Sequence, residues 1–238
     1  MVKFNDAGQG RGARTLVPGQ ELADTEPEAR PRPRRERPEE RFRRMNQEEE
    51  ALWSQGLLRV AGLDEAGRGP VAGPVAAAAC ILDPKRPIYG LNDSKKLSER
   101  RRELLYVEIK ERSLAHAVAL ISAEEVDLLG INSAIQLAMD RCLEALGPVD
   151  FLLVDQGAFC FSQDFRCHVK GDAQINCIAA ASILAKVSRD HYMIELDQRY
   201  PSYGFARHKG YGTPQHLRLI QELGPCPEHR RSFLQKYL

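Results

Sequence analysis

Residues 57–82 read LLRVAGLDEAGRGPVAGPVAAAACIL, and this stretch decides the fold. Its two apolar runs, residues 57–64 and 75–82, predict two buried strands. The glycines and prolines between them predict a tight turn, because glycine adopts backbone conformations that other residues avoid and proline interrupts a strand. Two acidic residues, Asp64 and Glu65, stand where the first strand meets this turn.

Strands and helices continue to alternate after this stretch. Apolar periodicity predicts strands over residues 115–122, 151–155 and 165–170, and helices over residues 98–112, 123–146 and 176–200. Ser98 is a plausible N-cap for the first of these helices, and a last helix is expected to begin at Thr213 and Pro214, which suit the N-cap and the first helical position. This order predicts an α/β domain around one mixed sheet.

Composition sets broad limits on function. The chain has 238 residues, enough for one large domain or two small ones, and its net charge of +1 gives no general case for a nucleic-acid partner. None of the six cysteines forms a Cys-x-x-Cys pair, which favours reduced cysteines over a zinc site. No apolar run reaches the roughly 18 residues of a membrane helix. We therefore expect a soluble, cytoplasmic protein with no membrane partner, and the sparse charge balance hints at a monomer.

The first fifty residues differ from the rest. Residues 28–50 read EARPRPRRERPEERFRRMNQEEE, which is rich in arginine, glutamate and proline. The segment has few apolar groups, and burying them cannot offset the conformational entropy that is lost on ordering. We therefore expect residues 1–50 to be a disordered tail. The arginines could hold nucleic acid nearby, but the interspersed glutamates favour a solvated extension.

Three acidic positions share one context. Asp64 and Asp155 each close an apolar strand, and Asp172 follows a third strand and precedes a helix. Carboxylates that converge at one edge of a sheet, without basic partners, suit divalent cations, which prefer oxygen ligands. Each acid could instead cap a helix or turn. The capping interpretation is strong for Asp172 alone. For Asp155 alone, capping and function are equally favoured. For Asp64 and Glu65 together, a functional role is favoured.

The glycine turn has two familiar alternatives. Gly67, Gly69 and Gly73 give the spacing G-x-G-x-x-x-G, which does not fit a dinucleotide-binding fingerprint, and no G-x-x-x-x-G-K-[ST] phosphate loop occurs in the sequence. What remains is a tight turn whose backbone can approach a ligand closely, with Arg68 projecting between two glycines. Viewed alone it could be an ordinary loop; the adjacent acids favour a binding role.

A basic and aromatic cluster lies near the C-terminus. Arg207, His208 and Lys209 are flanked by Tyr203-Gly204-Phe205 and by Gly210-Tyr211-Gly212. Basic residues interleaved with aromatic ones suit a surface that contacts phosphate and stacks on a sugar or base. The alternative is a solvated turn whose aromatic residues anchor the core, and the residues alone favour the two interpretations equally.

Five blocks of sequence together resemble one family. They are DEAGRGPVAGPV at 64–75, NDSKKLS at 92–98, LVDQ at 153–156, KGD at 170–172 with AAASILAKVSRD at 179–190, and YPSYGFARHKGYGT at 200–213. In this order they resemble ribonuclease HII, the bacterial type-2 ribonuclease H, over roughly residues 56 to 234. The related type HIII enzymes carry a lysine between the two turn glycines, so Arg68 favours HII.

The resemblance implies a fold and a set of roles. It implies a ribonuclease H-like fold, with a central mixed five-stranded sheet flanked by helices over residues 51–200 and a small C-terminal helical extension that binds substrate over residues 201–238. Four acids would bind two Mg²⁺ or Mn²⁺ ions during catalysis. Other residues would contact the substrate: a turn reading the 2′-hydroxyl, a lysine near a phosphate and a tyrosine stacking on a sugar. The implied catalytic and metal-binding residues are Asp64, Glu65, Asp155 and Asp172, and the substrate-binding ones are Gly67, Arg68, Gly69, Lys95 and Tyr211.

The favoured hypothesis is therefore an endoribonuclease. It would cut the RNA strand of RNA–DNA hybrids, and cut 5′ to single ribonucleotides in duplex DNA, leaving 5′-phosphate and 3′-hydroxyl ends. One alternative is a hybrid-binding protein without catalysis, which would not need four acids. Another is a nuclease or strand-transfer enzyme that acts on DNA alone, which would not need the glycine–arginine turn.

Overall fold

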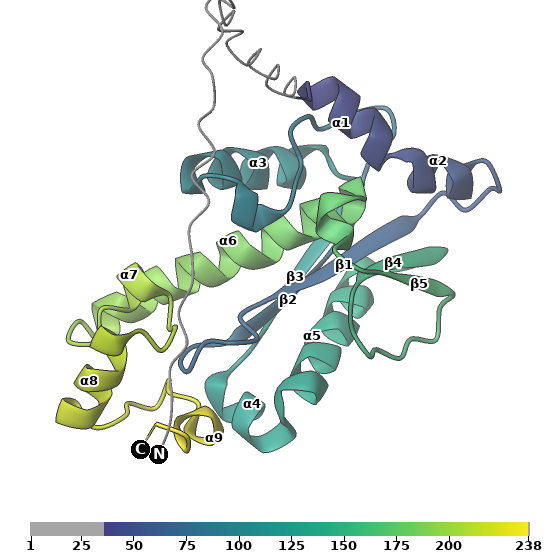
Figure 1. Cartoon of the computed structure of the whole chain (residues 1–238). Coiled ribbons are helices and arrows are strands. Elements are labelled where there is room, and N and C mark those ends of the chain that lie inside the picture. Colours follow the sequence, from purple (N-terminus) through teal and green to yellow (C-terminus); the bar gives the residue numbers. More distant parts are fainter. Residues whose placement is uncertain (1–35, 238) are drawn as a thin grey trace, which may run out of the picture. The chain divides into compact units, whose positions relative to one another are not determined.

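A five-stranded mixed sheet forms the centre of the molecule (Figure 1), in the computed structural model that describes residues 36–237. The strand order is β3-β2-β1-β4-β5. Strands β1, β2 and β3 form an antiparallel meander, and β4 and β5 add to β1 in parallel. The predicted α/β fold with one mixed five-stranded sheet is confirmed. The strands are β1 Val60–Ala66, β2 Val75–Ile81, β3 Ala115–Ile121, β4 Phe151–Asp155 and β5 Phe165–His168.

Helices cover both faces of this sheet (Figure 1). The long helix α6 crosses one face together with α3, and α4 and α5 cover the other. The helices are α1 Pro38–Met45, α2 Gln47–Trp53, α3 Glu99–Arg112, α4 Ala123–Leu129, α5 Ile131–Leu146, α6 Asn176–Arg199, α7 Phe205–His208, α8 Pro214–Leu223 and α9 Arg231–Leu234, with short 3-10 turns η1 Ser94–Lys96 and η2 Gly171–Ala173.

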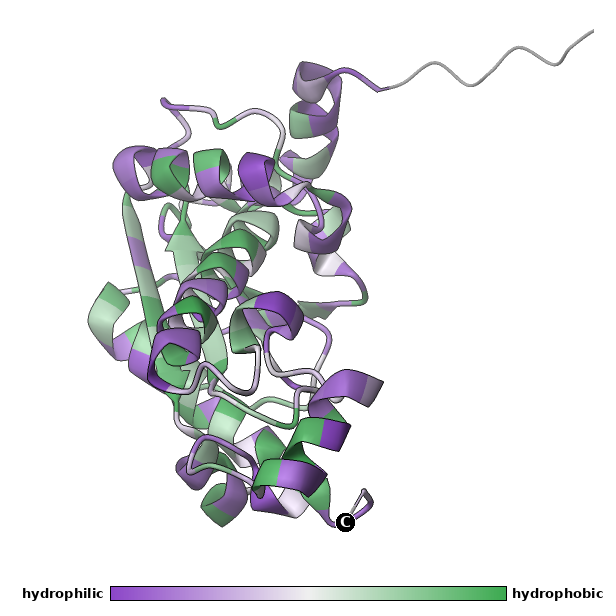
Figure 2. Cartoon of the chain, turned by 90° about the vertical axis from the view of Figure 1, so that its left-hand side faces the viewer, coloured by the Kyte–Doolittle hydropathy of each residue, from purple (hydrophilic) through white to green (hydrophobic). Residues whose placement is uncertain are grey.

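Strand β2 serves both layers because its side chains are small. Ala76, Ala78 and Cys80 pack toward α6, and the alternate residues pack toward α5. Every residue of β2 is buried, as expected of a strand covered on both faces. Figure 2 shows the same arrangement, with apolar strands and an apolar central helix inside outer helices that are largely hydrophilic.

Helix α6 lies unusually close to β1, and Gly62 makes this possible. A Cβ atom at Gly62 would stand 2.1 Å from the backbone carbon of Cys177 and 2.4 Å from the nitrogen of Ile178. No side chain fits there, so glycine sets the distance between the strand and the helix. The residues of α6 that follow, from Ser182 to Arg189, are thereby carried along the end of β1.

The N-terminal boundary that we expected at residue 50 is wrong, because α1 and α2 occupy residues 38–53. Four side chains on one stripe of these helices face the core: Phe42, Met45, Glu49 and Leu52. Their spacing of three and four residues is that of a helix face. The apolar residues are few but correctly spaced, which a judgement from composition overlooks. Residues 1–35 of the expected tail lie outside the described residues.

Glu49 connects this segment to α6. Helix α6 has no side-chain cap of its own at Ile175, and the buried Glu49 carboxyl lies beside the backbone of Asn176 and Cys177 at the start of this helix. The Asn176 side chain in turn donates to the carbonyl of Phe42 at 3.0 Å. An acidic side chain at a helix N-terminus lies next to backbone donors that the helix leaves free.

Two other boundaries differ from the prediction. The helix predicted over residues 123–146 is interrupted at Gly130, whose φ of +77° suits glycine and separates α4 from α5. Strand β1 runs from Val60 to Ala66 rather than over residues 57–64, so that Glu65 lies within the strand. The predicted caps of α3 and α8 are confirmed: Ser98 accepts from the amide of Arg101, and Thr213 from that of His216, both at 3.3 Å.

The C-terminal helices form a small cluster at one end of the molecule (Figure 1). Helices α7, α8 and α9 pack on the C-terminal half of α6 through a separate apolar core that includes Met193, Phe205 and Ile220. The described residues 36–237 nevertheless belong to one compact unit. The small C-terminal helical extension predicted beyond residue 200 is thus present. Within residues 36–237 no helix is long and apolar enough to cross a membrane.

Replacing Gly62 with alanine should destabilise the protein by about 2 kcal/mol or more, because the new methyl group must separate β1 from α6. Thermal unfolding would measure the loss. The control is Gly69→Ala, where the nearest atom beyond the adjoining residues, Tyr211 Cε1, would lie 3.9 Å from the new Cβ. An unfolding midpoint for Gly62→Ala equal to that of the control would show that the close approach is not a constraint.

Glu49 should make stability depend on pH. Burial raises the pKa of Glu49 to about 8, against an unfolded value near 4.5. The folded protein therefore holds a proton that the unfolded chain releases, and stability should fall as pH rises from 4.5 to 8. Glu49→Gln should flatten this fall in denaturant titrations, whereas Glu50→Gln, at an exposed position on the same helix, should leave it unchanged. A parallel pH profile for Glu49→Gln and the parent would contradict the assignment.

Candidate active site

A cavity of about 310 Å³ opens beside the C-terminal end of β1. It gathers residues from β1, the glycine turn, η1, β4, α6 and the segment before α8. Its lining includes eight of the nine residues that the sequence singles out; the ninth, Asp172, is not on its wall. The full lining is Asp64, Glu65, Ala66, Gly67, Arg68, Gly69, Ser94, Lys95, Asp155, Ser182, Lys186 and Tyr211.

The parallel pairing of β1 and β4 brings the first acids together. Leu63 pairs with Val154, so Asp64 and Asp155 each follow directly after a paired position. Asp64 is only 5% exposed, and its Oδ1 accepts the amide of Glu65 at 2.7 Å. Adjacent parallel strands thus carry two carboxylates to one edge of the sheet, as the sequence predicted.

Asp172 reaches the same region through a turn rather than a strand. It lies in η2, and the preceding Gly171 donates its amide to Asp155 Oδ1 at 2.7 Å. Lys170 enters this turn with a φ of +58°, a left-handed conformation that a lysine seldom adopts. The turn therefore holds Asp172 against Asp155, although Asp172 does not line the cavity itself.

The acids hinder one another's ionisation. Burial raises the pKa of Asp64 well above its usual range, and the charges of Glu65 and Asp155 raise it further. Burial likewise raises the pKa of Glu65, against the opposing effect of Arg68. Burial and the charges of Asp93 and Asp155 raise the pKa of Asp172 to about 6. Carboxyls that are buried together in this way need positive charge to ionise fully.

These carboxyls fit a divalent cation by their chemistry. Glu65 Oε2 is buried and has no hydrogen-bond partner, which is costly unless a cation or proton is supplied. All four donors are carboxylate oxygens, the ligands that hard cations prefer. As the side chains stand, no three metal-ligating groups within residues 36–237 are gathered tightly enough to enclose an ion. The ligand chemistry fits, and the acids would have to draw together around the ion.

Arg68 links the glycine turn to the acids. Its Nε donates to Glu65 Oε1 at 3.2 Å, and its Nη1 donates to Asn132 Oδ1 on α5 at 2.7 Å. Gly67 has a φ of +93°, so the turn needs glycine there. The Tyr211 side chain, 49% exposed, lies beside Gly69. The turn, an acid and an exposed aromatic ring thus share one wall.

Sequence reasoning missed four polar residues at or beside this cavity. Ser182 and Lys186 lie four positions apart on α6, a segment that we interpreted as apolar and buried. Ser182 donates to Ser94 at 3.0 Å, which anchors the η1 turn that carries Lys95. The i, i+4 spacing of Ser182 and Lys186 on an otherwise apolar helix was the available signal. Ser94 and Asn132 gave no comparable pattern.

The basic and aromatic cluster divides into core and surface. Tyr203 and Phe205 are buried, as the core-anchor alternative predicted, while Tyr211 is exposed. His216, to which the sequence assigned no role, is fully buried; its Nδ1 lies 2.9 Å from the carbonyl of Tyr211 and its Nε2 lies 3.1 Å from His229 Nε2. The amide of Cys226 donates to His229 Nδ1, so His229 Nε2 carries the proton and donates to His216.

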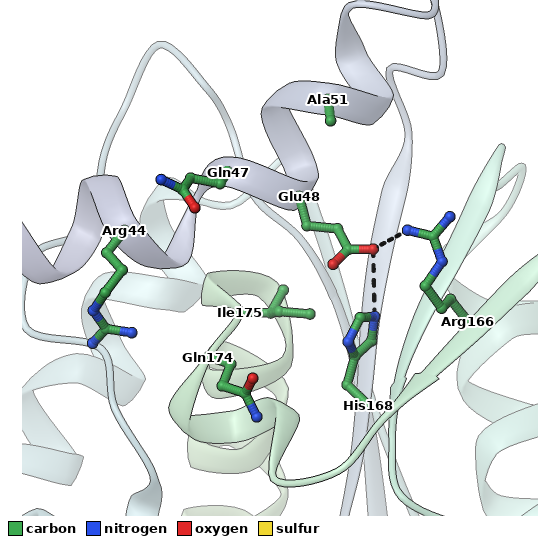
Figure 3. Close-up of a pocket in the computed structure, with 8 residues that line it drawn as sticks. All are labelled: Arg44, Gln47, Glu48, Ala51, Arg166, His168, Gln174 and Ile175. Carbon is green, nitrogen blue, oxygen red and sulfur yellow. Dashed lines mark hydrogen bonds and ion pairs between the residues drawn. The ribbon is translucent and has the colours of Figure 1, made fainter.

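A larger cavity of about 460 Å³ lies elsewhere, between α2 and β5 (Figure 3). Glu48 projects into it and pairs with both Arg166 and His168 (Figure 3). Arg44, on its far side, is paired with Glu36. These basic groups already have carboxylate partners, so they are not free to bind an anion. The ion pairs of Glu48 connect the N-terminal helices to the sheet.

Comparison with known proteins gives the same family from sequence and from structure. Residues 61–236 match the family model described as Ribonuclease HII. A ribonuclease HII of Burkholderia pseudomallei (strain 668) is 54% identical over 176 residues, which cover 73% of this chain and 82% of the relative.

Solved structures agree with this match. The ribonuclease H2 of Pyrococcus horikoshii OT3 has a TM-score of 0.61 at 27% identity, covering 75% of this chain and 96% of that one. The ribonuclease HII in a PCNA complex from Archaeoglobus fulgidus has a TM-score of 0.62 at 27% identity, covering 73% and 93%. The chain therefore belongs to the ribonuclease HII family, and it is a ribonuclease H, a hydrolase that acts on the RNA of RNA–DNA hybrids.

Proposed function

We propose that this ribonuclease H cuts on the 5′ side of a ribonucleotide, both in RNA–DNA hybrids and at single ribonucleotides within duplex DNA, leaving 5′-phosphate and 3′-hydroxyl ends. One observation carries the proposal. Asp64, Glu65 and Asp155 share a cavity wall with the Gly67–Gly69 turn and with Tyr211. The acids suit phosphodiester hydrolysis, and the turn and the tyrosine suit recognition of one sugar beside the bond that is cut.

Recognition rests on the 2′-hydroxyl, the group that distinguishes RNA from DNA at one position. Within the turn, Gly67 and Gly69 leave the backbone open to a close approach. Arg68 forms an ion pair with Glu65, so a shift of the turn would change the position of the Glu65 carboxylate. Tyr211, beside Gly69, has an exposed ring that could stack on the neighbouring deoxyribose, and Lys95 lies near enough to approach a phosphate.

We further propose that Asp64, Glu65, Asp155 and Asp172 together bind two Mg²⁺ or Mn²⁺ ions. The raised pKa values of Asp64 and Glu65 and the unpartnered Glu65 Oε2 support a cation in this place. When bound, such ions stabilise charge on the attacking water and on the leaving oxygen. The chain's own part is to hold the carboxylates apart from bulk water until substrate and ions arrive. Lys95 lies on the same cavity and would balance substrate phosphate charge, whereas Lys186, also on its wall, is paired with Asp190.

The setting of the enzyme is also proposed. All six cysteines are free, which suits a reducing, cytoplasmic compartment. A monomer suffices, because every residue assigned to the site comes from one chain. Membership of the ribonuclease HII family excludes the alternative of an enzyme that acts on DNA alone, and such an enzyme would have no use for a turn that reads a 2′-hydroxyl.

A duplex with one ribonucleotide tests the proposed specificity. With Mg²⁺ or Mn²⁺ the protein should cut this duplex 5′ to the ribonucleotide and leave an all-DNA duplex intact, as gel analysis of end-labelled strands would show. Asp64→Asn should lower the rate at least about 100-fold, because a buried carboxylate of the metal site is lost. Equal cutting of both duplexes would remove the 2′-hydroxyl from the mechanism, and an Asp64→Asn variant at the parent rate would remove Asp64.

Divalent ions should also stabilise the folded protein, since they bind the folded state only. At a hundredfold excess over Kd the gain is about 2.7 kcal/mol, visible as a higher Tm. Glu65→Gln should raise the Tm in EDTA, because it relieves repulsion, and should reduce the gain with Mn²⁺. Glu144→Gln, an exposed change on α5, should behave as the parent does. A Mn²⁺-induced shift that Glu65→Gln leaves unaltered would place the ion elsewhere.

A further inference from the structure

Two arginines are buried beneath the glycine turn without any acidic partner. Arg189 of α6 is 1% exposed, and Arg230, just before α9, is 0% exposed. Within residues 36–237 neither forms an ion pair with a carboxylate. Burying an uncompensated charge is expensive, and arginine is almost never fully buried without a partner. Their hydrogen bonds show what compensates for it.

Arg189 donates to three backbone carbonyls. Its Nε bonds to Pro74 O at 2.8 Å, its Nη2 to Ala72 O at 3.1 Å and its Nη1 to Lys209 O at 3.0 Å. Two of these carbonyls follow the glycine turn, and the third lies two residues before Tyr211. One guanidinium therefore fixes the turn and the tyrosine segment relative to each other.

The Arg230 side chain binds three further carbonyls of the same stretch. Its Nε bonds to Gly73 O at 2.9 Å, and its Nη1 bonds to Pro70 O at 3.0 Å and to Arg68 O at 3.4 Å. Together the two arginines occupy five carbonyls between residues 68 and 74. With these carbonyls held on the protein side, the backbone of the turn has a fixed orientation toward the cavity.

Backbone contacts tie the same segments together. Gly210 O accepts from the amides of Val71 and Ala72 at 2.9 and 3.2 Å. The amide of Gly73 donates to Glu228 O at 2.8 Å, and that of Arg230 donates to Val71 O at 2.9 Å. The arginines thus sit beneath a junction of three chain segments rather than beneath one loop.

One glycine of the turn also fits Arg189. A Cβ at Gly67 would lie 2.2 Å from Arg189 Nε. In the tyrosine segment, a Cβ at Gly210 would lie 2.3 Å from Ala72 O, a carbonyl that Arg189 binds. Gly67 is therefore required partly because the Arg189 side chain passes directly against it. The conformation of the turn and the position of the Arg189 side chain therefore depend on each other.

We propose that Arg189 and Arg230 are positioning residues for 2′-hydroxyl recognition: they hold the Gly67–Gly69 turn and Tyr211 in one rigid arrangement against the acids. This inference rests on the proposed function, since it concerns how that turn reads a ribonucleotide. Arginine is required because its planar fork serves several carbonyls at fixed angles, whereas a lysine ammonium is a single point charge. Neither arginine lines the cavity, so each would act through the turn and the tyrosine segment.

The test compares Arg189→Lys and Arg230→Lys with Leu143→Ala, a core change on α5 across the sheet that lowers stability without touching the turn. Each purified protein is assayed with Mn²⁺ on a duplex with one ribonucleotide, for kcat and KM separately. Its affinity for that duplex and for an all-DNA duplex is measured with Ca²⁺, and its Tm with and without Mn²⁺. These readouts separate positioning from folding and from metal binding.

The lysine variants should lose about 10- to 100-fold in kcat, because a misplaced sugar misaligns the scissile bond. They should keep the Mn²⁺-dependent rise in Tm and their affinity for all-DNA duplex, and lose the preference for the ribonucleotide duplex. Leu143→Ala should lower the Tm as much as the lysine variants do, but it should keep the parent kcat and the preference for the ribonucleotide duplex.

Two outcomes overturn the inference in distinguishable ways. If the parent prefers the ribonucleotide duplex and the lysine variants keep that preference and the parent kcat, or lose no more than Leu143→Ala, the arginines only stabilise the fold. If the parent itself shows no preference, the proposed function fails first, and the positioning role fails with it.

Discussion

The contact between α6 and β1 is the constraint on which the rest of the structure depends. Gly62 lets the helix backbone lie against the strand, and the small residues of β2 keep the neighbouring surface shallow. Beyond that contact, α6 places Ser182 and Lys186 beside the acids and Arg189 beneath the glycine turn. One helix therefore packs the core, lines the cavity and supports the turn. The N-terminal helices, through Glu49, complete the start of this helix.

A second theme is charge buried for function. Burial and the charges of Glu65 and Asp155 raise the pKa of Asp64, and the protein holds these acids together although this costs stability. Arg189 and Arg230 are buried close by, and burial lowers the pKa of each, to about 10 and about 9. They do not pair with the acids; they pair with carbonyls. Apart from the pair between Arg68 and Glu65, the two signs of charge thus have separate tasks: the acids are available to ions, and the two buried arginines fix the shape of the turn.

Much of this architecture could be predicted from local pattern. The apolar runs predicted the strands, Ser98 and Thr213 predicted helix starts, and the acids near strand ends indicated the candidate site, because each signal depends on neighbours in sequence. The N-terminal helices were missed because Phe42, Met45 and Leu52 are few and lie among charges, and their partner surface is distant in sequence. The break at Gly130 was missed because a single glycine within a helical pattern does not reveal a positive φ.

The buried arginines could not be predicted at all. In the sequence Arg189 and Arg230 look like any of the other basic residues, and only the tertiary structure brings carbonyls of residues 68–74 to them. Asn132 and His216 are similar, since their partners Arg68 and Tyr211 lie on other segments. Polar residues that act on a distant backbone leave no periodic pattern in the sequence.

The central claim is that the acids and the glycine turn form one unit around a ribonucleotide. A crystal structure of the chain with a ribonucleotide-containing duplex and Ca²⁺, which occupies oxygen sites, tests it most directly. The account predicts ions held by Asp64, Glu65, Asp155 and Asp172, with the 2′-hydroxyl hydrogen-bonded to the backbone of the Gly67–Gly69 turn. A 2′-hydroxyl that faces solvent or another segment, with ions in the acids, would contradict it.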